Sequence, residues 1–272
     1  MLTLNLVGCG RVGKTLAHLW HAHQAVRIQD VLTTSAQSAA QAVAFIGCGA
    51  AVPTLARMRP ADLWMIAVPD RQIEASASEM ARTLAGRAGA MAFHCSGALG
   101  SSALAPLQEQ GWQTASAHCI LSFASPTEAI RQFAGTPCSL EGDAAVTACL
   151  HQIFTAIDAR CFAIAAEQKI LYHAAAVFAT NFVPVLQAVA EDLWRGSGVP
   201  PELLPRLRSS LLRNAVDNIV TLGPATALTG PAARGDTALV NQQAAAVANW
   251  DETSGAAYRA LSELAMRLAR ST

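Results

Sequence analysis

A glycine-rich segment near the amino terminus limits the folds that this chain can adopt. In LVGCGRVGKTLAHLW, the residues Gly8, Gly10 and Gly13 form the pattern G-x-G-x-x-G. The same segment fits the pattern G-x-x-x-x-G-K-T through Gly8, Gly13, Lys14 and Thr15. The first pattern is typical of a turn that binds a dinucleotide, and the second of a loop that binds the phosphates of ATP or GTP. Both patterns predict a strand followed by a helix, so the choice between them depends on the surrounding sequence.

The surrounding sequence favours the dinucleotide pattern. A P-loop enzyme needs an acidic residue after a second apolar strand to hold magnesium, but in LWMIAVPD the candidate Asp70 follows Pro69 and lies beyond the strand. In a dinucleotide fold, Gly8 allows the tight turn, Gly10 the approach of the pyrophosphate, and Gly13 the packing of helix on strand. We therefore expect a dinucleotide site, with a P-loop and a purely structural glycine turn as the alternatives.

The end of the second predicted strand bears on the choice of cofactor. NAD enzymes usually place Asp or Glu there to bind the ribose hydroxyls. Here the chain continues VLTTSAQSA, and Thr33, Thr34 and Ser35 offer hydroxyl groups to a 2′-phosphate. Asp30 lies near the expected distance from the glycines, but the strand continues beyond it. We therefore expect NADP, with NAD as the alternative. The predicted cofactor site consists of Gly8, Gly10, Arg11, Val12, Gly13, Thr33, Thr34, Ser35, Val68 and Pro69.

Strand-like apolar runs alternate with helical stretches in the first part of the chain. The runs are TLNLVG, VRIQDVL, LWMIAVP, AMAFHC, QTASAHC and CFAIA. Such alternation is typical of a parallel sheet with helices on both faces. Only helical spacing follows, over residues 166–195, 201–222, 236–250 and 255–270. We predict an α/β fold in which a doubly wound, mostly parallel Rossmann-type sheet in residues 1–165 precedes an all-helical domain in residues 166–272.

Charge and hydropathy narrow the choice of partners. Lysine plus arginine and aspartate plus glutamate both number 19, so the chain lacks the excess positive charge that nucleic acid or an anionic membrane would attract. We expect a small-molecule substrate. Apolar residues make up 52% of the chain and charged residues 14%, so a second domain or a second copy must cover much of the surface. We expect a homodimer formed through the C-terminal helical domain.

The sequence offers no signal for secretion or for a metal site. The chain begins with the strand-like TLNLVGCG rather than a basic region and an apolar region, so we expect a cytoplasmic protein. Residues 170–190 carry no formal charge but include His173, Asn181 and Pro184. We expect a helix buried inside the protein there rather than a membrane span. The seven cysteines include no C-x-x-C pair, so we expect reduced core thiols and no metal.

Seven segments together resemble one family. They are the G-x-G-x-x-G turn, AVPD, HCSGAL, AHCILSF, GTPCSLEGD, AEQKILYHAAAVFATN and LTGPAARGD. Over essentially the whole chain they resemble the candidate NADP oxidoreductases that join a Rossmann-like domain to the C-terminal domain of unknown function 2520. The architecture is more distantly similar to deazaflavin-linked NADP oxidoreductases, ketopantoate reductases and 3-hydroxyacid dehydrogenases, which have a helical dimerising domain. The resemblance implies the fold and the cofactor much more than the reaction.

The chain departs from these families at two positions. In 3-hydroxyacid dehydrogenases a catalytic lysine is followed four residues later by asparagine, whereas Lys169 is followed by His173 and the nearest asparagine is Asn181. In AHCILSF, Cys119 stands where the family usually has proline after His118. The resemblance thus implies a catalytic role for Lys169 but puts a hydroxyacid substrate in doubt.

A polar stripe on the helix after the sheet is the candidate catalytic site. Lys169, His173 and Thr180 lie four and seven residues apart, which places them on one helical face, and Asn181 continues it. We interpret Lys169 and His173 as catalytic, with Lys169 polarising a carbonyl or imine and delivering a proton, and Asn181 as a substrate ligand. The alternative is that Lys169 lies in solvent and the other two are satisfied core polar groups.

Other candidates lie in strand ends and in a late loop. His94 and Ser96 follow one strand and His118 lies near the end of the next, at the edge where open α/β folds bind ligands. We predict substrate contacts for these residues and for Arg234. The alternatives are a capping serine, histidines bonded to backbone, and a solvated arginine. Cys95 is not a nucleophile in this interpretation, because neighbours in a strand point to opposite faces.

Together these features predict an NADP-dependent oxidoreductase. It would transfer a hydride between NADP(H) and a small carbonyl, hydroxy or imine compound in a cleft between the two domains. The alternative is a dinucleotide-binding sensor or scaffold without catalysis, because the same fold hosts both behaviours.

Overall fold

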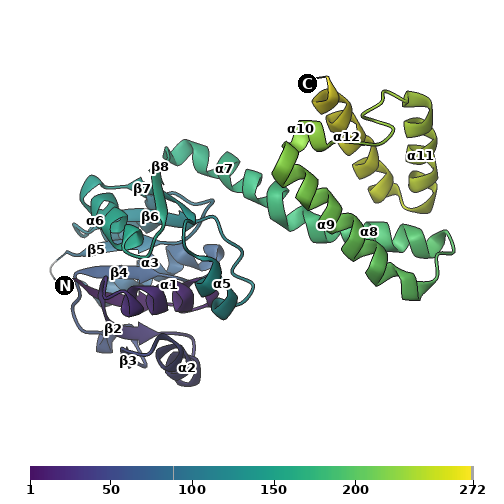
Figure 1. The fold of residues 1–272 in the computed structure, drawn as a ribbon. Coiled ribbons are helices and arrows are strands. Elements are labelled where there is room, and N and C mark those ends of the chain that lie inside the picture. Colours follow the sequence, from purple (N-terminus) through teal and green to yellow (C-terminus); the bar gives the residue numbers. More distant parts are fainter. Residues whose placement is uncertain (88, 271–272) are drawn as a thin grey trace. The chain divides into compact units, whose positions relative to one another are not determined.

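The computed structural model describes residues 1–87 and 89–270 and divides into two compact units (Figure 1). The first unit is Met1–Ala179, and the second begins at Thr180. The sequence predicts a boundary after residue 165, but helix α7 (Lys169–Ala176) belongs to the first unit. The reason is that side chains of α7 contact the loops and strands of the sheet. The predicted catalytic helix is therefore part of the sheet-containing unit.

An eight-stranded sheet forms the centre of the first unit. Its strands are β1 (Thr3–Val7), β2 (Arg27–Leu32), β3 (Ala50–Ala51), β4 (Leu63–Ile66), β5 (Met91–His94), β6 (Gln113–Cys119), β7 (Pro137–Gly142) and β8 (Arg160–Ala163). The order is β3-β2-β1-β4-β5-β6-β7-β8, and only the pair β6 and β7 is antiparallel. The order reverses at β1, where a doubly wound sheet opens a crevice at its carboxyl edge. The predicted fold class is confirmed.

The sequence predicts neither β3 nor β7. Strand β3 has only two residues, and β7 reads PCSLEG, whose proline, glycine and glutamate favour a turn. Strand β7 nevertheless pairs with β6 from Gly142 opposite Ala115 to Cys138 opposite Cys119. The partner strand, rather than local composition, makes this segment a strand.

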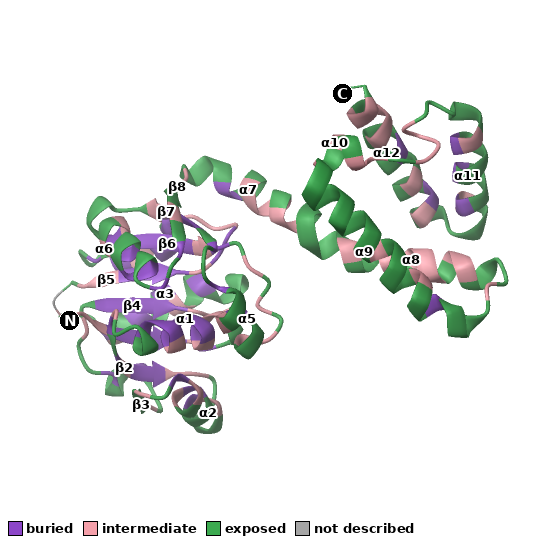
Figure 2. Cartoon of the chain, viewed as in Figure 1, coloured by how far each residue is buried: buried purple, intermediate pink, exposed green. Residues whose placement is uncertain are grey.

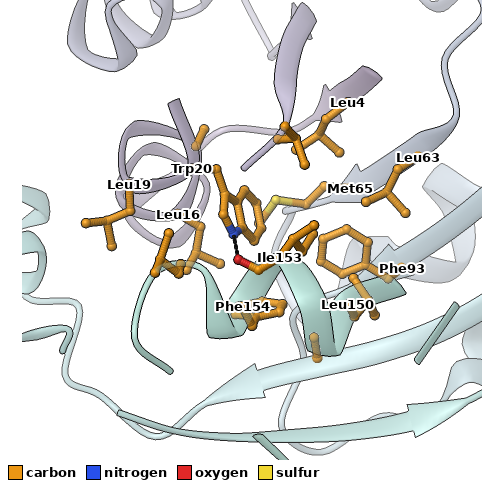
Figure 3. Packing of buried hydrophobic residues seen from close by; sticks show 14 of the residues in the cluster. Leu4, Leu16, Leu19, Trp20, Leu63, Met65, Phe93, Leu150, Ile153 and Phe154 are labelled. Atoms are coloured by element: carbon orange, nitrogen blue, oxygen red, sulfur yellow. Dashed lines mark hydrogen bonds between the residues drawn. The ribbon is translucent and has the colours of Figure 1, made fainter. Parts of the chain in front are cut away.

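Helices cover both faces of the sheet (Figure 1). They are α1 (Arg11–Ala22), α2 (Ala36–Ile46), α3 (Ile73–Thr83), α4 (Ala105–Gln108), α5 (Pro126–Gln132) and α6 (Ala144–Thr155). Trp20 of α1 donates its indole N–H to the carbonyl oxygen of Ile153 in α6 at 3.0 Å, and its ring meets Phe93 and Phe154 edge-on (Figure 3). This contact packs the first helix, and with it the glycine turn, against the sheet.

The two cores follow from the alternation of side chains along the strands. In β4, Leu63 and Met65 belong to the cluster that contains Trp20, whereas Trp64 and Ile66 belong to a second cluster with α3 and α4. Successive side chains of a strand point to opposite faces, so one apolar run supplies both cores. The strand ends are thereby held at one edge of the sheet.

The described residues of the second unit form helices joined by turns and loops, with no strand among them. Its helices are α8 (Phe182–Gly196), α9 (Leu204–Leu222), α10 (Pro224–Ala227), α11 (Thr237–Trp250) and α12 (Glu252–Ala269). Figure 2 shows that these helices expose most of their residues, in contrast to the strands of the first unit. Among the few buried side chains are those of Leu204, Val240 and Val247. The predicted all-helical region is confirmed.

The apolar stretch after Lys169 is exposed in the single chain, so the expectation of a buried helix is wrong. The helical segment Ala166–Gly196 is long and apolar enough to cross a membrane by length and composition, and its most apolar window, of mean hydropathy 1.4, is not buried. Its beginning is fixed to the sheet through the fully buried Lys169 and through Tyr172, whose hydroxyl lies 3.0 Å from Nδ1 of His118. Hydropathy alone does not show whether the residues that pack against such a helix belong to the same chain.

Candidate functional site

The three glycines of the amino-terminal turn meet different steric demands. Gly8 has a φ of +80°, and a Cβ there would lie 2.6 Å from both the carbonyl oxygen of Ala67 and Cγ1 of Val68. Gly10 precedes α1 and has no atom within 4 Å of the position of a Cβ. At Gly13 a Cβ would lie 3.3 Å from Cβ of Ala67. The geometry thus fits a tight turn at Gly8, space for a ligand to approach the backbone at Gly10, and close packing of helix on strand at Gly13. A dinucleotide pyrophosphate can therefore reach the free N–H groups that begin α1.

The remaining predicted residues of this turn lie around the same opening. Arg11 is the exposed first residue of α1, and Val12 follows it. Val68 and Pro69 follow Ala67 at the end of β4, the strand that neighbours β1. Both strands end at the same edge, so these residues flank Gly8, as a cofactor cradle requires.

The alternative P-loop does not fit the structure. Thr15 is fully buried and donates its hydroxyl to the carbonyl oxygen of Arg11 at 2.9 Å. In a P-loop this hydroxyl binds magnesium. Because Thr15 faces the core, G-x-x-x-x-G-K-T is here a coincidence of spacing.

Hydroxyl groups gather between β2 and α2. Ser35 caps α2, with its Oγ accepting the N–H of Ser38 at 3.1 Å, and Oγ1 of Thr33 lies 2.5 Å from Oγ of Ser38. Thr34 is exposed beside them. No acidic residue occupies the first turn of α2. The three predicted phosphate ligands thus surround the N-terminus of a helix, where an anion is favoured.

Asp30 is held in a structural ion pair. Its side chain is 1% exposed and accepts hydrogen bonds from the backbone N–H of Arg59 at 2.7 Å and from its guanidinium at 2.5 Å. Its own N–H donates to Oδ1 of Asn5. A carboxylate held in this way has its acceptors occupied, which fits the interpretation of Asp30 as strand interior.

A cavity of about 250 Å³ lies at the carboxyl edge of the sheet. Its lining includes Val12, Asp70, Ser96, Gly97, His118 and His173. The structure therefore brings one predicted cofactor residue together with three predicted substrate or catalytic residues. Cys95 also lines the cavity, and burial raises the pKa of its thiol to about 12. That thiol stays protonated at neutral pH, as expected for a residue that is not a nucleophile.

Ser96 organises the turn that follows β5. Its hydroxyl donates to Oδ2 of Asp70 at 2.7 Å and accepts the N–H groups of Ala98 and Leu99 at 3.2 Å and 3.0 Å. The side chain is buried, so these bonds fix the wall of the cavity. Asp70, which follows β4, is thereby tied to the turn after β5.

His94 supports the same turn and has no free ring nitrogen. Its Nε2 lies 2.9 Å from the carbonyl oxygen of Gly100, and its Nδ1 accepts the N–H of Ser96 at 3.2 Å. These contacts place the proton on Nε2, and burial lowers the pKa of the ring. The predicted substrate contact of His94 is not supported by this geometry, because backbone groups occupy both nitrogens.

Lys169 is fully buried behind the cavity wall. Its Nζ donates to the carbonyl oxygen of Ser96 at 3.2 Å. Burial lowers the pKa of this ammonium, and the carboxylates of Glu141 and Asp70 oppose that shift. The alternative of a solvated lysine is wrong. A buried amine with a lowered pKa is the form in which lysine serves as an acid or base near neutral pH.

Two histidines meet over Gly97. A Cβ at Gly97 would lie 2.6 Å from Nδ1 of His173 and 2.8 Å from Nε2 of His118. The rings are 5.6 Å apart and nearly perpendicular. Burial, followed by the charges of His173 and Lys169, lowers the pKa of His118 to about 4. His118 is therefore neutral at pH 7, and a side chain at position 97 would fill the space in front of both rings.

The predicted polar stripe is interrupted in the structure. Helix α7 ends at Ala176 and a π-helix follows at Val177–Asn181. Thr180 and Asn181 lie in this π-helix, whose i→i+5 hydrogen bonding departs from the α-helical spacing on which the predicted stripe depends. Asn181 belongs to the second unit, where it accepts the hydroxyl of Thr180 at 2.9 Å.

Arg234 also belongs to the second unit. It is exposed in the loop before α11. Its substrate contact therefore remains a prediction.

The sequence interpretation missed two functional candidates. Tyr172 lies three residues after Lys169 on α7 and its hydroxyl is 3.0 Å from Nδ1 of His118. Helical spacing could have indicated it. Glu141 accepts hydrogen bonds from the N–H and hydroxyl of Ser101 and from the hydroxyl of Ser116. Only the pairing of β6 with β7 reveals that residue.

The turn, the sheet and the cavity at its carboxyl edge define a Rossmann-type dinucleotide-binding domain. Comparison with known families agrees, because residues 1–119 match the Rossmann-like domain and residues 136–265 match the domain of unknown function 2520. The chain belongs to the proteins that join these two domains, as its motifs predict. No curated protein matches it.

Solved structures share the architecture over nearly the whole chain. A protein of Thermotoga maritima is 27% identical with a TM-score of 0.75, and 98% of each chain is covered. A candidate NADP oxidoreductase of Bacteroides fragilis is 22% identical with a TM-score of 0.74 at the same coverage. An imine reductase of Myxococcus stipitatus in complex with NADP⁺ is 18% identical with a TM-score of 0.60, covering 99% of this chain and 93% of the other. At these identities the likeness establishes the fold.

Proposed function

We propose that this protein is an NADP-dependent oxidoreductase that transfers a hydride between NADP(H) and a small carbonyl, hydroxy or imine compound. The cavity carries the proposal, because it joins Val12 of the glycine turn to Ser96, His118 and His173, with Lys169 buried behind Ser96. A cofactor on the glycine turn would reach the same edge of the sheet as these titratable groups. The Myxococcus reductase, which has this fold, binds NADP⁺.

The protein groups in this site have complementary tasks. When bound, NADPH supplies the hydride. Lys169 is the proposed proton donor, because an ammonium whose pKa burial has lowered is a stronger acid at neutral pH. His173 is the proposed second catalytic group, since its Nδ1 is buried without a hydrogen-bond partner. Ser96 and Asp70 hold the wall in place.

The cofactor preference rests on the end of β2. Thr33, Thr34 and Ser35 surround the N-terminus of α2, and Asp30 is bound to Arg59. We expect NADPH to bind at least about tenfold more tightly than NADH, which corresponds to ~1.4 kcal/mol. Fluorescence titration of both cofactors measures this ratio. Equal affinities, or tighter binding of NADH, would show that Asp30 leaves Arg59 to bind the ribose.

The chemistry is tested at Lys169. Replacement by Met keeps the aliphatic stem and removes the ammonium, so we expect Lys169→Met to lower turnover by roughly 10² while the affinity for NADPH stays within about twofold. Oxidation of NADPH is followed with a panel of small ketones, hydroxy acids and cyclic imines. Arg82→Met, at an exposed position in the last turn of α3, controls for loss of a cation outside the proposed site.

Two results would contradict this assignment. Full turnover in Lys169→Met would remove Lys169 from the reaction. Tight NADPH binding by the wild-type protein, with no oxidation across the panel, would instead indicate a dinucleotide sensor or scaffold.

The proposed assembly is a cytoplasmic homodimer formed through the helical domain. Val185 in α8 and Val216, Ile219 and Val220 in α9 are about half or more exposed in the single chain. A second copy would cover such apolar helices in the way that obligate dimers bury their interfaces. A cytoplasmic location accords with the use of NADPH, which is an intracellular cofactor.

A further inference from the structure

Tyr172 contacts a histidine of the proposed site through its hydroxyl. The phenol oxygen lies 3.0 Å from Nδ1 of His118 and 3.5 Å from the carbonyl oxygen of the same residue. The shorter contact has normal hydrogen-bond geometry, whereas the longer one is at the limit. The phenol proton is therefore best placed on the bond to Nδ1. Nδ1 of His118 is then an acceptor, and the ring proton lies on Nε2.

The opposite side of the His118 ring faces the cavity. Nε2 of His118 and Nδ1 of His173 both lie against the space that a side chain at Gly97 would fill. Nδ1 of His173 is buried without a hydrogen-bond partner, although both rings line the cavity. A buried polar atom without a partner is costly, so a bound group that supplies the missing hydrogen bond would be favoured.

We propose that Tyr172 is a positioning residue that holds His118 in the Nε2–H tautomer, so that Nε2 donates a hydrogen bond to the carbonyl oxygen or imine nitrogen of the substrate. The donated bond polarises the reacting double bond while the ring remains neutral throughout, and the proton that completes the reduction comes from Lys169. The substrate contact in this inference rests on the proposed function, but the tautomer of His118 is a property of the protein alone.

The neighbouring contacts support a fixed arrangement. The ring of Tyr172 meets that of His118 edge-on, with 5.5 Å between centroids, and it also meets Phe162. Burial raises the pKa of the Tyr172 hydroxyl, so the phenol keeps its proton at neutral pH and can donate. A neutral imidazole that donates from one nitrogen while the other is held by a neighbour is an established way to polarise a carbonyl.

The tautomer is measured without substrate by long-range ¹H–¹⁵N correlation spectra of ¹⁵N-histidine-labelled full-length protein. The signals of His118 are assigned from their loss in His118→Asn. In the wild type we expect Nε2 protonated and Nδ1 unprotonated and hydrogen-bonded. In Tyr172→Phe the Nδ1 resonance should shift and the tautomer populations should change. The control is Tyr258→Phe, because Tyr258 is the other tyrosine of the chain and its hydroxyl donates to Gln243 at 2.7 Å.

Turnover links the tautomer to the reaction. With a surrogate that the wild type reduces, Tyr172→Phe should lower kcat by about tenfold at nearly unchanged KM, and His118→Asn by about 10². The double variant should be no slower than His118→Asn, because Tyr172 acts through His118. Tyr258→Phe should have wild-type kinetics.

Three outcomes would overturn the proposal. They are a proton on Nδ1 of His118 in the wild type, an unchanged His118 spectrum in Tyr172→Phe, and additive losses in the double variant. A wild type that oxidises no surrogate would refute the proposed function and the substrate contact together. The spectrum would still decide whether Tyr172 sets the tautomer.

Discussion

Two glycines of one motif differ in what they contribute. Gly8 has a left-handed φ and backbone atoms that would overlap a Cβ, whereas Gly10 has an ordinary φ of −73° and open space. The first glycine is required by the fold itself, and the second is required only if something must approach the backbone. A substitution at Gly8 should therefore lower mainly the stability of the protein, and one at Gly10 mainly its affinity for the cofactor.

We expect Gly8→Ala to destabilise the protein by about 2 kcal/mol or more, because it adds both backbone strain and a clash with Ala67. Gly10→Ala should cost about 1 kcal/mol or less, as for alanine at a helix N-cap, while weakening NADPH binding at least about tenfold. Urea denaturation and fluorescence titration measure the two effects. If Gly10→Ala bound NADPH like the wild type, the open space would have no connection with the pyrophosphate.

At the scale of elements, helix α7 is joined to the sheet by polar contacts. Lys169 reaches the turn after β5, and Tyr172 reaches His118 on β6. Burial of His118 disfavours its charged form and gives this junction a pH dependence. In the unfolded chain the pKa of His118 is near 6.5, whereas in the folded protein burial lowers it to about 4. Between these values the unfolded state binds more protons, so stability falls as the pH falls.

We expect the free energy of unfolding to decrease between pH 6.5 and pH 4, with His118 contributing at most ~3 kcal/mol across that range. His94, whose pKa burial also lowers, acts in the same direction. In His118→Asn the decrease should be smaller. Urea denaturation at a series of pH values gives the slopes, with His23→Asn as an exposed control. Identical slopes in the wild type and His118→Asn would show that His118 titrates normally.

At the scale of the whole molecule, the helices of the second unit leave apolar side chains uncovered. Val220 is 81% exposed and Leu222 is 52% exposed, both on α9. The apolar window within Ala166–Gly196 is exposed as well. Patches of this kind are typical of surfaces that contact a second protein or a membrane.

We expect the wild type to be a dimer at micromolar concentration and Val220→Glu to shift it towards monomer, because a buried carboxylate without a partner is costly. Light scattering measures the mass, and Ala40→Glu on an exposed face of α2 serves as control. A wild-type monomer that sediments with phospholipid vesicles would show that a bilayer, rather than a second copy, covers these helices.

The features of this protein that depend on local pattern can be predicted from its sequence. The G-x-G-x-x-G turn, the alternation of apolar runs and the helical spacing after residue 165 predicted the fold class and the helical second region. These patterns suffice because backbone sterics at Gly8 and periodic burial in strands and helices act over a few residues. The spacing of Lys169 and the family resemblance likewise indicate this residue as a candidate.

The contacts that these residues make depend on the folded chain. Strand β7 forms because β6 supplies its hydrogen-bond partners. Both ring nitrogens of His94 are hydrogen-bonded because Gly100 and Ser96 lie against the ring. Tyr172 contacts a residue of the proposed site because β6 places His118 beside it. Each depends on contacts between segments far apart in the chain or on the folding of a loop. The same is true of the lowered pKa of Lys169, since the sequence names a lysine but only the packed fold removes it from water.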